Sequence, residues 1–146
     1  MRYFFQDVFI AKVKKLLKNN AYSNCEKALI NDVFGLAFDD LIAKCTAYRL
    51  NADSNNPIAK LRISHNAGKS SSYRVYVFVI IKDEKMYFAI LYPKTGKYKQ
   101  NSLSSKEETK VIKGLLGEIR EQNVKEVYLD KTSDKICYVA NKKKVF

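Results

Sequence analysis

The stretch that decides the fold is SYRVYVFVII, residues 72–81, in which β-branched and aromatic side chains follow one another almost without interruption. Such residues fit the pleated surface of a sheet, so the stretch predicts a strand near the centre of one. A second strand is predicted over 58–64, after the turn-forming segment NADSNNP at 51–57, and a third over 86–91, after a turn at Asp83-Glu84. Together the three strands predict an antiparallel meander.

The residues before this meander predict a short strand and several helices. Tyr3–Phe5 is an aromatic run suited to a strand, and Asp7 is placed to cap the helix that follows. The S-x-x-E pattern of Ser23–Glu26 predicts a capping box at the start of a second helix. Gly35 is expected to end that helix with a positive φ, and Phe38–Cys45 to form another short helix.

The residues after the meander predict one helix and one hairpin. Acidic residues in the first turn and apolar residues at helical spacing favour a helix over about 105–121. Residues 124–129 and 136–139 read as the two strands of a terminal hairpin, and Lys142–Lys144 as a frayed, solvated tail.

These patterns predict a single α+β domain over residues 1–146, in which N-terminal helices pack on a twisted antiparallel β-sheet and an extra hairpin follows at the C-terminus. The parts are a helical region at about 7–50, a basic sheet at about 58–92, a helix at about 105–121 and a hairpin at about 124–140.

The charge of the chain is strongly positive. It contains 27 Lys and Arg against 15 Asp and Glu, a formal net charge of +12. Residues 60–99 hold nine of the basic residues and two of the acidic ones, and so carry +7 of that charge. This distribution favours a polyanionic partner that binds at the sheet.

The three cysteines, Cys25, Cys45 and Cys137, are odd in number and widely spaced, which predicts buried free thiols in a reducing compartment. Polar residues interrupt the apolar run at the N-terminus before it reaches the length of a signal-peptide core. We therefore expect a cytoplasmic protein that acts without a membrane.

Between Ala59 and Glu118 the chain resembles a known family. Four of its segments resemble, in the same order, four elements of RelE/HigB/ParE toxins. KLRI is similar to the basic strand, and GKSSSYRVYVFVI to the G-K-S loop and the arginine strand after it. YFAILYPKTGK is similar to the third strand, and SLSSKEETKVIKGLLGE to the L-S-x-x-E helix. The RelE/HigB/ParE proteins are the toxins of bacterial type II toxin-antitoxin systems. The resemblance implies a RelE-like layer of two helices packed on a twisted antiparallel sheet whose concave face receives RNA in the ribosomal A site.

The reaction implied by the resemblance is cleavage of ribosome-bound mRNA without a metal or other cofactor. The ribose 2′-hydroxyl attacks the adjacent phosphorus, and the 5′-oxygen leaves. The protein then has to position these atoms and stabilise the extra negative charge on phosphorus. Lys60 or Lys94, crowded by other cations, could act as the general base.

Residue by residue, the resemblance implies a catalytic set drawn from the basic strands, the loop between them and the end of the third strand: Arg74, Lys60, Arg62, Lys94 and His65. Cations and tyrosines around these strands are the expected RNA-binding residues: Lys69, Tyr73, Tyr92, Lys97, Tyr98 and Lys99. The tyrosines have a second interpretation, because aromatic side chains in strands also pack the sheet.

Two departures from the family leave alternatives open. Thr95 and, approximately, Leu103 stand where RelE has a second arginine and a tyrosine. One alternative is a ParE-type poison of DNA gyrase with the same fold, and another is an RNA-binding domain of this fold without catalysis. The expected partners are a cognate antitoxin, in a possible heterotetramer, together with mRNA and the ribosomal RNA.

Overall fold

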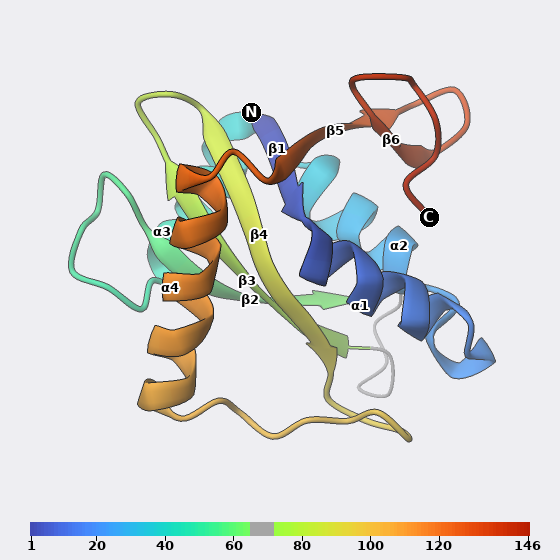
Figure 1. Ribbon diagram of the computed structural model, residues 1–146, viewed down its shortest axis with the longest axis horizontal. Helices are drawn as coiled ribbons and strands as arrows, with labels where there is room; N and C mark the ends of the chain where they lie inside the picture. Colours follow the sequence, from blue (N-terminus) through green and yellow to red (C-terminus); the bar gives the residue numbers. More distant parts are fainter. Residues whose placement is uncertain (65–71) are drawn as a thin grey trace.

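The computed structural model describes residues 1–64 and 72–146 and shows an α+β fold with helices on both faces of a sheet (Figure 1). In chain order the elements are β1 (Arg2–Gln6), α1 (Asp7–Leu17), η1 (Asn20–Tyr22), α2 (Cys25–Leu29), the π-helical turn η2 (Ile30–Phe34), α3 (Phe38–Ala47), β2 (Ile58–Ser64), β3 (Ser72–Ile80), β4 (Lys85–Pro93), α4 (Ser105–Arg120), β5 (Val124–Asp130) and β6 (Lys135–Tyr138).

The described strands form one six-stranded sheet in the order β2-β3-β4-β1-β5-β6. The predicted meander is present as β2, β3 and β4, which pair antiparallel. The prediction of a wholly antiparallel sheet is wrong, because β1 runs parallel to β4. A strand shows the same alternation of side chains beside a parallel or an antiparallel neighbour, so the local pattern could not reveal this direction.

The two faces of the sheet bury two separate cores. On one face, α1, α2 and η2 cover an aromatic cluster in which the Phe5 ring lies 4.7 Å from the Phe9 ring and 4.9 Å from the Phe88 ring. On the other face α4 covers a smaller core (Figure 1). Its buried members are Tyr76, Tyr87, Ala89, Tyr92, Ile112 and Leu115.

The starts of the first two helices differ from the prediction. Asp7 is the first residue of α1 and makes no capping hydrogen bond; its carboxylate instead pairs with Lys125 of β5. The capping box of Ser23–Glu26 does not form, since α2 has no side-chain cap. Glu26 is buried and accepts hydrogen bonds from Ile136 N–H at 2.9 Å and from Lys135 Nζ at 3.2 Å.

Gly35 follows η2, but with a φ of −83° rather than the positive φ that was predicted. The close approach of the chain explains the glycine: a Cβ atom at this position would lie 2.9 Å from the main-chain oxygen of Ile30. The predicted third helix is present as α3, two residues longer than Phe38–Cys45.

The predicted helix after the meander is α4. It begins with a capping box in which Glu107 N–H donates to Ser104 Oγ at 3.2 Å and Ser104 N–H donates to Glu107 Oε1 at 3.0 Å. These bonds satisfy two main-chain donors that would otherwise be free at the helix start. They also fix the end of the segment that joins β4 to α4.

The C-terminal hairpin is present as β5 and β6. It joins the sheet through the antiparallel pairing of β5 with β1. The prediction of a frayed tail is wrong. Lys143 O accepts a hydrogen bond from Tyr138 N–H at 2.9 Å, and Val145, which is 2% exposed, donates from N–H to Ile136 O at 3.0 Å. Burial of Val145 holds the main chain of the three lysines beside β6, while their side chains are exposed, as predicted.

The cysteines are buried free thiols, as predicted: Cys25, Cys45 and Cys137. Burial raises the pKa of Cys25 to about 12 and that of Cys45 to about 11. Both are therefore protonated and unreactive at neutral pH. Within residues 1–64 and 72–146, no helix has the length and apolar character needed to cross a membrane.

Candidate nucleic-acid interface

Strand pairing brings basic side chains from neighbouring strands together on the face of the sheet that α4 partly covers. Arg62 of β2 lies directly opposite Arg74 of β3, and Arg74 lies opposite Tyr92 of β4. Two residues before Arg62, Lys60 lies opposite Tyr76. Side chains two residues apart in a strand point to the same face, so Lys60 and Arg62 share one surface with Arg74.

Arg74 lies in the middle of this surface and is half-buried. Its Nη1 donates to the main-chain oxygen of Tyr73 at 3.3 Å. Burial, followed by the like charge of Arg62, lowers the pKa of Arg74 from its ordinary value, although an arginine remains charged at neutral pH. Neither arginine forms an ion pair with any residue that the structure describes. Two facing like charges without a counter-ion favour the binding of an anion.

Two lysines extend this surface. We call the four basic residues together the cationic face: Lys60, Arg62, Arg74 and Lys94. Lys60 Nζ lies 3.3 Å from Ser102 Oγ, and Lys94 Nζ donates to Gln100 O at 3.4 Å. Both contacts are with the segment that joins β4 to α4. Neither neutralises a charge, so the lysines keep their attraction for phosphate.

A carboxylate from α4 reaches the same side of the sheet. Tyr76 Oη donates to Glu108 Oε2 at 2.8 Å. Burial is the largest cause of the raised pKa of Tyr76, and this hydrogen bond is the second. The ring of Tyr92 lies 6.3 Å from that of Tyr76. The buried Oη of Tyr92 makes no hydrogen bond of ordinary geometry with the described residues, although it lies near enough to Tyr76 to add to the raised pKa of that tyrosine. A ligand on this side would therefore meet the carboxylate of Glu108, whereas the Tyr92 hydroxyl is buried beneath the surface.

The structure separates Tyr73 from the cationic face. Tyr73 points to the opposite side of the sheet, is 1% exposed and donates from Oη to Asn24 Oδ1 at 2.6 Å. Tyr92 faces the correct side but is fully buried. Neither ring is accessible to a base in this structure, and packing of the sheet is the interpretation that their burial supports.

Three more predicted RNA-binding residues lie in the segment after β4: Lys97, Tyr98 and Lys99. Tyr22 ties this segment to the helices of the opposite face, because its Oη donates to Thr95 O and accepts from Tyr98 N–H, both at 2.9 Å. Gly96, with a φ of +83°, makes the turn next to Tyr22. The half-buried Tyr98 thus packs against the first core. Of the remaining predicted residues, His65 and Lys69 lie outside the described residues.

The structure adds two residues that the sequence did not indicate. From the sequence, Glu108 is an acidic residue of the kind favoured in the first turn of a helix. Its neighbours in the sequence do not indicate its hydrogen bond with Tyr76, which lies 32 residues away. Tyr48 follows α3 and runs beside the outer edge of β2, where its main-chain oxygen accepts from Lys60 N–H at 3.3 Å. It is 59% exposed, and among the described residues it is the only aromatic side chain with high exposure.

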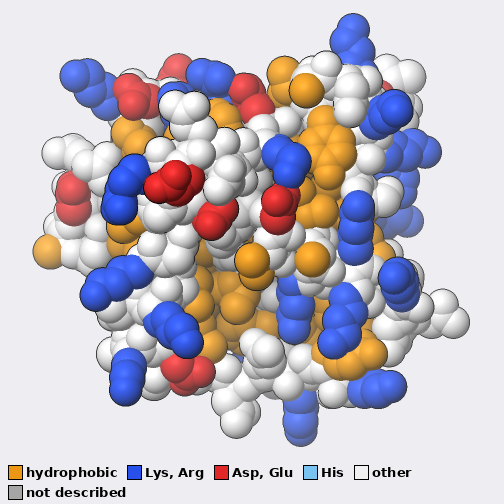
Figure 2. Space-filling model, in the orientation of Figure 1, with side chains coloured by type: hydrophobic (Ala, Val, Ile, Leu, Met, Phe, Trp, Pro, Cys, Tyr) orange, Lys and Arg blue, Asp and Glu red, His pale blue; other side chains and the backbone are white. Residues whose placement is uncertain are grey.

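The density of basic residues does not by itself distinguish the cationic face from the rest of the surface. In Figure 2, Lys and Arg side chains surround most of the visible outline of the molecule. The centre of that view is a hollow with hydrophobic side chains, in the region where Val8, Ile90 and Val111 line a pocket between α1 and α4. What distinguishes the cationic face is the direct opposition of Arg62 and Arg74 on a sheet.

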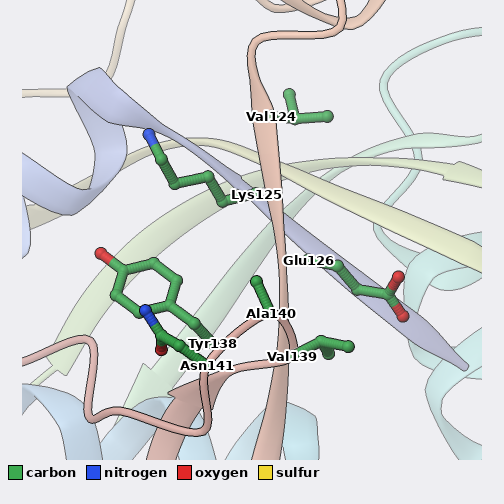
Figure 3. Close-up of a pocket in the computed structure, with 7 residues that line it drawn as sticks. All are labelled: Val124, Lys125, Glu126, Tyr138, Val139, Ala140 and Asn141. Atoms are coloured by element: carbon green, nitrogen blue, oxygen red, sulfur yellow. The ribbon is translucent and has the colours of Figure 1, made fainter.

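A pocket of about 650 Å³ lies elsewhere, beside β5 and β6. Figure 3 shows its two charged side chains, Lys125 and Glu126, on opposite sides of β5. Both already have partners, because Lys125 pairs with Asp7, and Glu126 pairs with Arg2 at 2.7 Å. The pocket therefore offers no free charge that would select a ligand.

Comparison with known proteins yields no match, whether among family models, curated proteins or solved structures. The likeness to RelE-type toxins stays a prediction, and the function has to be argued from the surface itself.

Proposed function

We propose that this protein is the toxin of a bacterial toxin-antitoxin pair, a RelE-type endoribonuclease that cuts mRNA on the ribosome. The observation that carries the proposal is the Arg62–Arg74 pair, two guanidinium groups that face each other across β2 and β3 with no ion-pair partner among the described residues. A guanidinium binds a phosphate through two parallel hydrogen bonds, which a lysine cannot copy.

The layered arrangement also supports the proposal. N-terminal helices pack on one face of the meander, as the resemblance to RelE implies, and the cationic face lies on the other. α4 covers only part of the second face, so the paired arginines are not buried beneath it. Arg62 is exposed and Arg74 is half-buried.

The proposed reaction needs charge stabilisation and two proton transfers. As the 2′-oxygen bonds to phosphorus, negative charge builds on the phosphate oxygens, and Arg62 and Arg74 stabilise it. Lys60 and Lys94 are the groups of the cationic face that can exchange a proton. One takes the proton of the 2′-hydroxyl, and the other gives a proton to the departing 5′-oxygen.

An antitoxin would cover the same face. Because the cationic face has no acidic partner within the described chain, an acidic segment of the antitoxin is the complementary ligand. Such a segment would compete with RNA, and two toxin-antitoxin pairs would form the expected heterotetramer.

The test is Arg74→Ala in bacteria that express the protein without its antitoxin. We expect the wild type to arrest growth and to create new mRNA 5′ ends in phase with codons within minutes. Arg74→Ala should reduce both by at least about a hundredfold, as removal of one transition-state donor typically does. Mapping of cellular 5′ ends and viable counts give the two readouts.

Arg120→Ala is the matched control, since Arg120 is an exposed arginine at the end of α4. It should behave as the wild type. Growth arrest by the wild type without new 5′ ends would replace this proposal with the gyrase-poison alternative. Neither arrest nor new ends would leave an RNA-binding domain without catalysis.

A further inference from the structure

A second pocket, of about 370 Å³, lies between the first half of α4 and the edge of the sheet. Its apolar lining comes from Leu50, Ile58 and Ile112, and its polar lining includes Ser105, Glu108 and Lys113. The volume lies within the range of small-molecule sites, roughly 300–1,000 Å³. An apolar lining with a few polar groups is typical of small-molecule sites.

The pocket is continuous with the cationic face. Ile58, in its lining, lies two residues before Lys60 on the same face of β2. Glu108, also in its lining, is hydrogen-bonded to Tyr76, which lies directly opposite Lys60. The pocket therefore lies next to Lys60, at one end of the cationic face.

The polar group that gives the pocket its selectivity is Glu108. Its Oε2 accepts the Tyr76 hydroxyl at 2.8 Å, which fixes the carboxylate in place. Within the described residues Oε1 has no hydrogen-bond partner, and Glu108 forms no ion pair. A carboxylate only accepts hydrogen bonds, so it recognises a ligand edge that donates.

We propose that this pocket binds a base of the RNA and prefers guanine, an inference that rests on the proposed function. The Watson–Crick edge of guanine presents two adjacent donors, N1–H and the exocyclic N2 amino group, to one carboxylate. Adenine and cytosine each place a ring acceptor beside their amino group, which a carboxylate repels, and uracil has one donor between two carbonyls. Single-stranded RNA is commonly recognised through such edges.

Tyr48 completes the site at its rim. It lies two residues before Leu50 at the edge of β2, and its ring is 59% exposed with no aromatic partner among the described residues. An exposed aromatic ring beside a phosphate-binding surface stacks on unpaired bases. In this arrangement one base enters the pocket and its neighbour stacks on Tyr48.

The test compares the binding of fluorescent hexaribonucleotides to the full-length protein at low salt. The sequences are a uridine hexamer and the same hexamer with a single central guanosine, inosine, adenosine or cytidine. The wild type should bind the guanosine oligomer about tenfold more tightly than the adenosine or cytidine oligomer. Inosine, which keeps N1–H but lacks the amino group, should fall between them.

Glu108→Gln should reduce the preference for guanosine to less than twofold while it still binds RNA, because an amide keeps an acceptor for Tyr76 but also carries donors. Glu118→Gln is the matched control on the same helix, about 15 Å further along α4. It should keep the full preference.

Each contrary outcome has a separate meaning. Equal binding of all five oligomers by the wild type would overturn the guanine pocket and leave RNA binding by the cationic face intact. A preference that survives in Glu108→Gln would overturn the role of this carboxylate. Failure to bind any oligomer at low salt would overturn both the pocket and the RNA-binding face on which it depends.

Discussion

Two tyrosine hydroxyls that lie close together beneath α4 differ in their bonding. Tyr76 donates to Glu108, whereas the buried Tyr92 hydroxyl makes no hydrogen bond of ordinary geometry with the described residues. A buried polar atom without a hydrogen bond costs about 1–3 kcal/mol of stability.

We therefore expect the two Tyr→Phe substitutions to change stability differently. Tyr76→Phe should lower the free energy of unfolding by about 1 kcal/mol, because the bond to Glu108 is lost. Tyr92→Phe should leave it unchanged or raise it by up to about 1 kcal/mol, because an unsatisfied hydroxyl is removed. Urea unfolding of both variants measures this. A larger loss for Tyr92→Phe than for Tyr76→Phe would contradict the bonding described.

The sequence could reveal those residues of the site whose side-chain direction follows from the alternation of side chains between the two faces of a strand. Lys60 and Arg62 share a face because they are two apart. The same rule places Tyr73 on the face opposite to Arg74, its direct neighbour, so its burial follows from the pattern. Glu108 and Tyr48 reach the site only through tertiary contacts, and no local signal marks them.

At the scale of elements, the sequence indicated every strand and the helices α1 to α4 of the described fold, but it missed the short η1 and misread several junctions. The S-x-x-E pattern at Ser23 fails as a capping box because Glu26 is drawn away by a partner 110 residues further on. The parallel pairing of β1 with β4 and the anchoring of the C-terminal tail likewise depend on contacts distant in the chain. Local periodicity does not contain such contacts.

Substitutions of Glu26 test whether its carboxylate holds the C-terminal hairpin to α2. Its carboxylate joins α2 to β6 by accepting from Ile136 N–H and from Lys135 Nζ. Glu26→Ala should lower the free energy of unfolding by about 2–3 kcal/mol, since it leaves a buried N–H without a partner. Glu26→Gln keeps one acceptor and should cost about half as much.

The exposed Glu121, just past α4, supplies the control, because Glu121→Ala should change stability by less than about 0.5 kcal/mol. Urea unfolding of the three variants measures the series. If Glu26→Ala were as stable as the wild type, the buried link between α2 and β6 would not contribute to holding the hairpin.

At the scale of the whole molecule, the larger core and the proposed functional site lie on opposite faces of one sheet. The larger core lies between the sheet and the N-terminal helices, and the cationic face lies on the other side, next to the smaller core under α4. Substitutions on the cationic face therefore leave the larger core intact. This separation allows the charges of the face to be removed while the fold is kept.

The most direct measurement uses purified protein, ribosomes and a defined mRNA. We expect the mRNA to be cut only when it is bound in the ribosome, with a 2′,3′-cyclic phosphate on the upstream fragment. Cutting should fail when the nucleotide at that site is 2′-deoxy, and it should fail with Arg74→Ala but not with Arg120→Ala. An intact mRNA with the wild type, or equal cutting by Arg74→Ala, would contradict the account of the cationic face as a ribonuclease site.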